Sequence, residues 1–352
     1  MSNAQLKASY RRKLRGSRRV DLALLFVAVA PLFFTACPKD SRPDTSRVAV
    51  SVRPPEASPS SEPIPSAVAF NGERAMDHVR KQVEFGPRIS GSPELAKTRE
   101  YIVNELKSSG LAVFTDEFTA ATPVGEKKMV NITAEVPGES KDVIIVSSHY
   151  DTKLYKDMRF VGANDPGTSV GTLLELGRVL AGSKQKPKLT YWLAFFDGEE
   201  AFCEGWEDCG KPGAPDNTYG SRHYVSQLRN KNELSRVRAL ILLDLMGYKN
   251  LELGRDTMSI KWLQDIVWQT GRELGYSSYF VDRPEGVGGD DHEPFLRAGI
   301  DSVDLIQLNG YPYWHKAEDT LDKVSSRSMK IVGETVLASL PRVEQHVLKQ
   351  AR

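Results

Sequence analysis

The sequence has few cysteines and few histidines, and these shortages limit the kinds of site it can build. Its 352 residues include only 3 Cys and 6 His. A zinc site made of cysteine pairs is not expected, because Cys203 and Cys209 have no second pair to join them. No uncharged apolar stretch reaches the roughly 20 residues of a membrane helix, which excludes a polytopic membrane protein.

The composition is that of a soluble globular protein. Hydrophobic residues make up 40% of the chain and charged residues 26%, which excludes wholesale disorder and collagen. Of the 47 Lys and Arg, 7 lie in residues 1–37, which hold one acid, so 40 basic and 45 acidic residues remain beyond them and the net charge there is −5. A mildly acidic body has no electrostatic footprint for nucleic acid, so we expect no nucleic-acid partner.

Residues 1–37 have the layout of a bacterial export signal. Met1–Arg19 is basic and holds no acid, and Leu22–Ala36 is a run of fifteen uncharged residues. As a helix this run spans only about 22 Å, short of the ~30 Å hydrocarbon core, which favours a cleaved signal over a spanning anchor. Small residues before Cys37 resemble a lipoprotein signal, in which Cys37 is acylated and becomes the mature N-terminus. An uncleaved anchor and simple secretion are the alternatives.

Residues 38–66 contain seven Pro and seven Ser, which predicts an extended tether without a core. We therefore expect one folded catalytic domain over residues 67–352. It would be exported to the cell envelope or periplasm, with contact to a membrane only through the N-terminal signal or its lipid. In an exported protein, Cys203 and Cys209, six positions apart, are expected to form a local disulfide.

The hydrophobic pattern of the domain alternates between strand and helix periods. Apolar runs buried on both faces are expected at 143–146, 189–196, 239–245 and 303–308, with half-exposed strands at 111–120 and 128–136. Helical spacing recurs at 71–85, 92–106, 169–181, 219–228, 259–274 and 326–340. This alternation predicts a three-layer α/β/α fold around a mostly parallel mixed sheet with an antiparallel edge.

Acidic residues and histidines follow the predicted strands. Ligands of such sheets bind beyond the carboxyl ends of the strands, so these side chains are expected to converge there. The candidates are His149, Asp151, Asp165, Glu199, Glu200, Asp244, Asp290, Asp291, His292 and His315. Each has an ordinary structural explanation alone, as a turn residue, a helix cap, a solvated charge or, for His149, a hydrogen-bonded core histidine. Together, carboxylates packed side by side must share protons or surround a cation, and their mixture with imidazole favours zinc.

Seven short motifs resemble the glutaminyl-peptide cyclotransferases, or glutaminyl cyclases, which share the fold of zinc aminopeptidases. The blocks Phe195–Phe202 and Asp290–Leu296 are the ones typical of the cyclase branch. The motifs stand at 148–151, 160–165, 195–202, 219–223, 242–245, 290–296 and 314–315.

The resemblance implies a role for individual residues. Asp165, Glu200 and His315 match the ligands of the family's single zinc, and Glu199 matches its general acid/base. Asp244 and Asp290 correspond to a hydrogen-bonded carboxylate pair beside the metal, and Trp206 and Trp314 to aromatic walls of the substrate pocket. The implied reaction converts an N-terminal glutaminyl residue of a peptide or protein to pyroglutamyl and releases ammonia.

Two other functions stay open at this stage. His149 and Asp244 complete a ligand set for two zinc ions bridged by Asp165, with which Glu199 would activate water as in an aminopeptidase. A catalytically silent domain that binds peptide N-termini at the envelope is the third hypothesis. The setting of Asp290 in Asp-Asp-His and the Trp immediately before His315 favour the cyclase.

Overall fold

The computed structural model describes residues 69–206, 208–211 and 213–350, and the predicted export signal with Cys37 and the tether lie outside them. The main sheet contains β1 (Ala112–Thr122), β2 (Gly125–Val136), β3 (Val143–His149), β4 (Thr190–Phe196), β5 (Val237–Leu243) and β8 (Ser302–Leu305). The strand order is β1-β2-β4-β3-β5-β8. β4, β3, β5 and β8 run parallel, whereas β1 and β2 are antiparallel additions at one edge. The predicted mixed sheet is confirmed.

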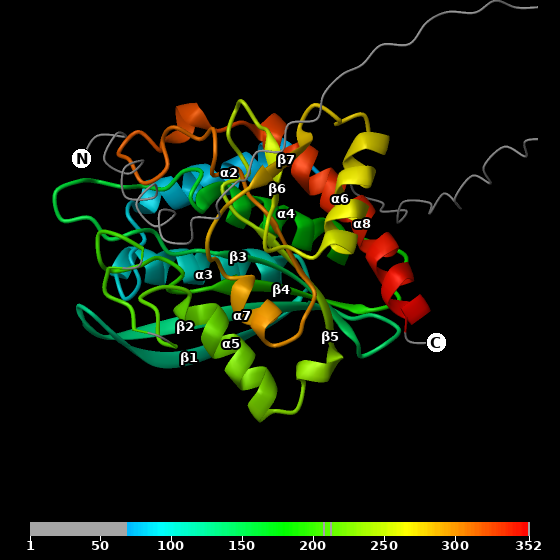
Figure 1. The fold of residues 1–352 in the computed structure, drawn as a ribbon, viewed down its shortest axis with the longest axis horizontal. Helices are drawn as coiled ribbons and strands as arrows, with labels where there is room; N and C mark the ends of the chain where they lie inside the picture. The colour runs from blue at the N-terminus through cyan, green and yellow to red at the C-terminus, as the bar shows by residue number, and fades with distance from the viewer. Residues whose placement is uncertain (1–68, 207, 212, 351–352) are drawn as a thin grey trace, which may run out of the picture. The chain divides into compact units, whose positions relative to one another are not determined.

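Helices cover both faces of this sheet. One face carries α2 (Gly72–Phe85), α3 (Pro93–Ser108), α4 (Gly167–Ala181), α6 (Lys261–Glu273) and α8 (Ser326–Gln350), whose apolar side chains share one core cluster. The other face carries α5 (Tyr219–Asn230) and the short α7 (Glu293–Arg297). Figure 1 shows α2, α4, α6 and α8 together on one side of the strands. The three layers predicted from the sequence are therefore present.

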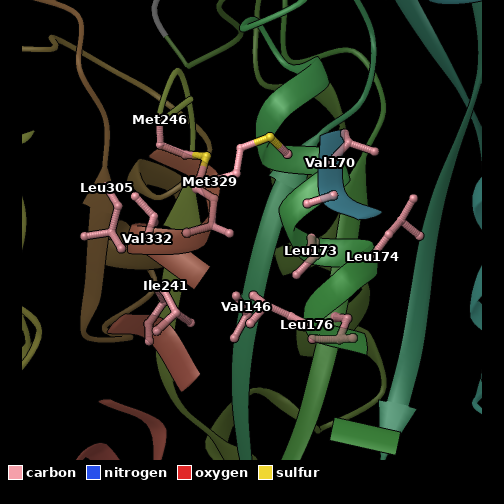
Figure 2. Close-up of a cluster of buried hydrophobic side chains, with 14 of the residues drawn as sticks. Val146, Val170, Leu173, Leu174, Leu176, Ile241, Met246, Leu305, Met329 and Val332 are labelled. Atoms are coloured by element: carbon pink, nitrogen blue, oxygen red, sulfur yellow. The ribbon is translucent and has the colours of Figure 1, made fainter. Parts of the chain in front are cut away.

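The central strands are hydrophobic throughout because both of their faces are buried. In β3, Ile144 and Val146 point into the core under α4, while Val143 and Ile145 point toward α5. Figure 2 shows the core on the α4 side of the sheet, in which side chains of α4 such as Leu173 meet those of β3, β5, β8 and α8. This packing fixes the strand ends, and with them the loops that follow.

Three features differ from the sequence-based expectation. A small parallel sheet of β6 (Leu253–Asp256) and β7 (Phe280–Glu285) was not predicted, because the strands are short and β7 exposes its centre. α8 was expected to end before Pro341 but continues to Gln350. Val343 and Val347 beyond the proline are buried in the core, and this burial offsets the lost backbone hydrogen bond. β8 ends at Leu305 rather than at 308.

The order of the strands reverses between β3 and β5, because the chain places β4 on one side of β3 and β5 on the other. A crevice is expected outside the carboxyl ends at such a switch point. His149 ends β3 and Asp244 directly follows β5, so the candidate residues lie at this position. Among the described residues, no helix is both long and apolar enough to cross a bilayer.

Candidate metal centre and active site

Asp165, Glu200 and His315 meet in space although they are far apart in the sequence. One ligand atom from each lies within 4.8 Å of the others. The Nε2 atom of His315 is 3.2 Å from Oε2 of Glu200 and 3.5 Å from Oδ2 of Asp165. His315 has a φ of 56°, in the left-handed region that non-glycine residues adopt mainly where function or packing demands it. The predicted trio therefore forms a compact group.

A second group shares Asp165 with the first. The Nε2 atom of His149 lies 3.3 Å from Oδ1 of Asp165 and 3.3 Å from Oδ1 of Asp244. These three residues also bring their ligand atoms within 4.8 Å of one another. Asp165 thus stands between two sets of ligands, as the two-metal alternative requires.

Both groups suit a divalent cation. All of these side chains except that of His315 are buried, and His315 is half-buried. Oε2 of Glu200 and Nδ1 of His149 are buried without a hydrogen-bond partner. Unpartnered polar atoms among adjacent carboxylates are costly, and a cation bound between them removes that cost. Carboxylate oxygen and imidazole nitrogen are donors that zinc accepts.

Asp165 is held by hydrogen bonds from two sides of its loop. The carboxylate of Asp319 accepts the amides of Asn164 (2.8 Å) and Asp165 (3.1 Å). The buried guanidinium of Arg88 donates to the carbonyls of Val161 (2.7 Å) and Gly162 (2.9 Å). Gly162 has a φ of 50°, and a Cβ there would lie 1.8 Å from the carbonyl oxygen of Asp165, so only glycine fits the turn.

The turn after β4 is held in the same manner. Asp151 accepts the backbone N–H of Glu199 at 3.0 Å and that of Glu200 at 3.2 Å. The sequence places Asp151 among the possible ligands, whereas the structure uses its carboxylate to fix this turn. Its Oδ1 atom also lies 3.6 Å from Nδ1 of His149.

The carboxyl of Glu199 is set up for proton transfer. Burial raises the pKa of Glu199 well above its ordinary value, and the charge of Asp290 raises it further. Burial and the neighbouring Asp244 also raise the pKa of Asp290 to about 7. A carboxyl whose pKa is raised holds a proton more readily, which suits it to return a proton as well as to accept one.

The resemblance implies a hydrogen bond between Asp244 and Asp290, but the structure gives each of these residues a different neighbour. Asp244 bonds to His149, with 3.3 Å between Oδ1 and Nε2, while one carboxyl oxygen of Asp290 lies within 4.8 Å of one of Asp304. The interaction that the structure gives between Asp244 and Asp290 is one of charge. Asp304 follows two apolar residues inside β8, and sequence reasoning did not identify it as part of the site.

Two tryptophans lie beside these groups. Trp314 is 40% exposed, and its ring stacks on that of His315 with centroids 4.3 Å apart. Trp206 is half-buried, and its Nε1 lies 4.0 Å from where a Cβ of Gly289 would stand, next to Asp290. Cys203 and Cys209 are joined by a disulfide in the loop that carries Trp206. Both aromatic side chains thus lie next to proposed site residues.

Comparison with known proteins agrees with this geometry. The model of peptidase family M28 matches residues 131–340. A glutaminyl-peptide cyclotransferase of Drosophila melanogaster is 29% identical over 267 residues, which cover 69% of this chain and 73% of the relative. The crystal structure of an Acidobacteriales bacterium glutaminyl cyclase is 34% identical, with a TM-score of 0.73 over 84% of this chain and 99% of that one.

A second solved relative carries a different activity in its name. It is a Zn-dependent exopeptidase from Parabacteroides distasonis, 26% identical, with a TM-score of 0.70 over 77% of this chain and 97% of that chain. The fold is thus shared by cyclising and hydrolytic enzymes. The chain therefore belongs to peptidase family M28, and within it to the group of glutaminyl-peptide cyclotransferases that its motifs resemble.

Proposed function

We propose that the protein is a zinc-dependent glutaminyl-peptide cyclotransferase, which acts on the N-termini of peptides or proteins. The observation that carries the proposal is the position of the Glu199 carboxyl. It is buried, its pKa is raised, and it directly precedes Glu200 of the candidate metal group. The cyclase relatives support the same reaction.

Asp165, Glu200 and His315 would hold one zinc ion. When bound, zinc supplies Lewis-acid polarisation of a carbonyl, which stabilises the transition state by several kcal/mol. The convergence of one ligand atom from each of the three residues to within 4.8 Å is the observation in this chain that fits such an ion.

The chemical step joins two parts of one glutaminyl residue. A bond forms between the α-amine nitrogen and the side-chain carbonyl carbon, and the bond from that carbon to the amide nitrogen breaks. Because the reacting atoms are already tethered, the protein has to select the ring-forming geometry and move protons. Glu199 would take a proton from the attacking amine and return it to the nitrogen that leaves as ammonia.

Other residues would orient the substrate. Asp244 and Asp290 are buried acceptors that can hold the N–H groups of the amine and of the leaving nitrogen. Trp314 would provide a flat apolar wall beside His315, and Trp206 a second wall near Asp290.

A di-zinc aminopeptidase is the second candidate, because a specific arrangement favours it. His149, Asp165 and Asp244 form a second possible metal group that shares Asp165 with the first. With two ions bound, Glu199 would deprotonate a water for hydrolysis of the first peptide bond. The choice between one and two ions therefore bears on the reaction as well as on the stoichiometry.

A side-by-side assay separates the candidates. We expect the purified full chain to release ammonia from a Gln-initiated peptide, to release no amino acid from a Leu-initiated peptide, and to retain about one zinc per chain. The measurements are an ammonia assay, mass spectrometry of both peptides and metal analysis of the same sample.

The other outcomes have distinct meanings. Free leucine together with two metal ions per chain would replace the cyclase by the aminopeptidase. A chain that retains both peptides without producing either product would be the envelope peptide-binding protein. A Glu-initiated peptide of the same length serves as the substrate control. Its side-chain carboxyl has the shape of the carboxamide but a poorer leaving group.

We propose further that residues 1–37 direct export and that Cys37 is acylated, so that residues 38–66 tether the catalytic domain of residues 67–352 to the envelope. The disulfide between Cys203 and Cys209 supports an oxidising compartment. In a bacterial host we expect the chain in the membrane fraction and Cys37→Ser in the soluble exported fraction. Equal distribution of the two proteins would contradict the lipid anchor, and retention of both in the cytoplasm would contradict export.

A further inference from the structure

Another buried cluster of polar side chains lies next to Asp290, outside the two candidate metal groups that share Asp165. It consists of Asp256 at the end of β6, His292 before α7 and Asp304 in β8, all 2% exposed or less. The Nε2 atom of His292 is 3.3 Å from Oδ2 of Asp256, and its Nδ1 atom is 3.9 Å from Oδ2 of Asp304. The imidazole therefore lies between two carboxyls.

The far end of this cluster is rigidly held. Oδ2 of Asp256 accepts the backbone N–H of Ser259 at 2.8 Å and its hydroxyl at 2.6 Å. The Oγ of Ser259 in turn accepts the backbone N–H of Asp304 at 2.9 Å. Ser259 thus holds both neighbours of the His292 ring, the carboxylate of Asp256 on one side and Asp304 on the other.

The near end of the cluster reaches the proposed active site. One carboxyl oxygen of Asp304 lies within 4.8 Å of one of Asp290. Burial raises the pKa of Asp304 well above its ordinary value, and the charge of Asp290 raises it further. Two adjacent buried carboxyls are stable when a single proton lies between them. The carboxyl of Asp304 thus lies beside both His292 and Asp290.

We propose that His292, held by Asp256, is a positioning residue that orients Asp304 and through it presents Asp290 to the substrate. The inference rests on the proposed function, because it gives a task to residues that the chemical step itself does not touch. The sequence places His292 among possible zinc ligands; the structure sets it apart from the two groups that share Asp165, beside the carboxyls of Asp256 and Asp304.

The test compares His292→Gln and Asp256→Asn with the wild-type full chain on a Gln-initiated peptide. We expect kcat to fall about 10–100-fold, as for other residues that orient a functional group, with KM changed less than about twofold. In an Asp290→Asn background, either substitution should add less than about threefold, because its effect passes through Asp290.

His78→Gln is the matched control. His78 is also buried, with Nδ1 2.6 Å from the hydroxyl of Tyr101, but it lies in α2 outside the site. It should lower the unfolding temperature as much as His292→Gln does while leaving kcat unchanged. Should His292→Gln fail to fold, the milder Asp256→Asn carries the comparison.

Three outcomes would overturn the proposal. Wild-type kcat in both variants would show that Asp290 needs no such support. A full additional loss in the Asp290→Asn background would show a general structural effect. Asp290, His292 and Asp304 also bring ligand atoms within 4.8 Å of one another, so a cation lost with His292→Gln but kept when Glu200 is replaced would make the cluster a metal site.

The failure of this inference can be told from that of the proposed function. A wild-type chain that forms no pyroglutamyl product but hydrolyses a Leu-initiated peptide contradicts the function. The same substitutions are then measured on hydrolysis, where absence of an effect contradicts the positioning role independently.

Discussion

Replacement of Glu199 by Gln is expected to lower kcat for cyclisation about 10³-fold, within the 10²–10⁴ range of general acid–base catalysis. The amide of Gln is close in shape to the carboxyl but cannot take a proton from the amine. Burial and the charge of Asp290 raise the pKa of Glu199, so the wild-type carboxyl is suited to this transfer. Initial rates of ammonia release at saturating peptide measure the effect.

A matched substitution separates chemistry from folding. Glu344→Gln changes another buried glutamate, which accepts the amide of Leu189 and the hydroxyl of Tyr191, both at 2.8 Å, at the start of β4. It should leave kcat unchanged. Glu199→Gln should keep the wild-type metal content, because Asp165, Glu200 and His315 are intact. More than about a tenth of wild-type kcat in Glu199→Gln would show that another group moves the proton.

The sequence predicts the fold well where burial controls the pattern. A strand covered by helices on both faces must be apolar at every position, and β3, β4 and β5 are recognisable for that reason. The reversal of strand order then collects the polar residues that follow each strand. His149, Glu200 and Asp244 could be predicted at one site because each lies at the end of such a strand or within four residues of it, without any knowledge of side-chain geometry.

The supporting residues could not be predicted because their partners are distant in the chain. Asp319 accepts amides about 155 positions away, and Arg88 binds a loop more than seventy positions later. Such contacts leave no periodic trace in the sequence. Asp304 has the same property: a carboxyl within a short strand is read as an edge residue until the structure places Asp290 beside it.

The two-strand sheet of β6 and β7 illustrates another limit. Its importance lies in Asp256, which ends β6 and faces His292. Neither strand is long or regular enough to be detected by alternation, so the position of Asp256 follows only from the three-dimensional structure.

Replacement of Asp165 by Ala is expected to have the largest effect on metal content, because Asp165 belongs to both candidate ligand groups. Loss of this carboxylate leaves Glu200 and His315 as two ligands, fewer than a zinc site needs. Metal content should fall below a tenth of the wild-type value after dialysis. Loss of roughly 4 kcal/mol of transition-state stabilisation would lower kcat/KM by about 10³-fold.

Comparison with Asp244→Ala decides how many ions the protein uses. Asp244 belongs only to the group with His149, so in a one-zinc cyclase this variant keeps its metal and loses activity through substrate orientation alone. In a two-zinc enzyme it loses one ion of two. Asp265→Asn, at a half-buried carboxylate of α6, is the charge-matched control and should retain both metal and activity. Full metal content in Asp165→Ala would contradict both ligand sets, since each depends on that carboxylate.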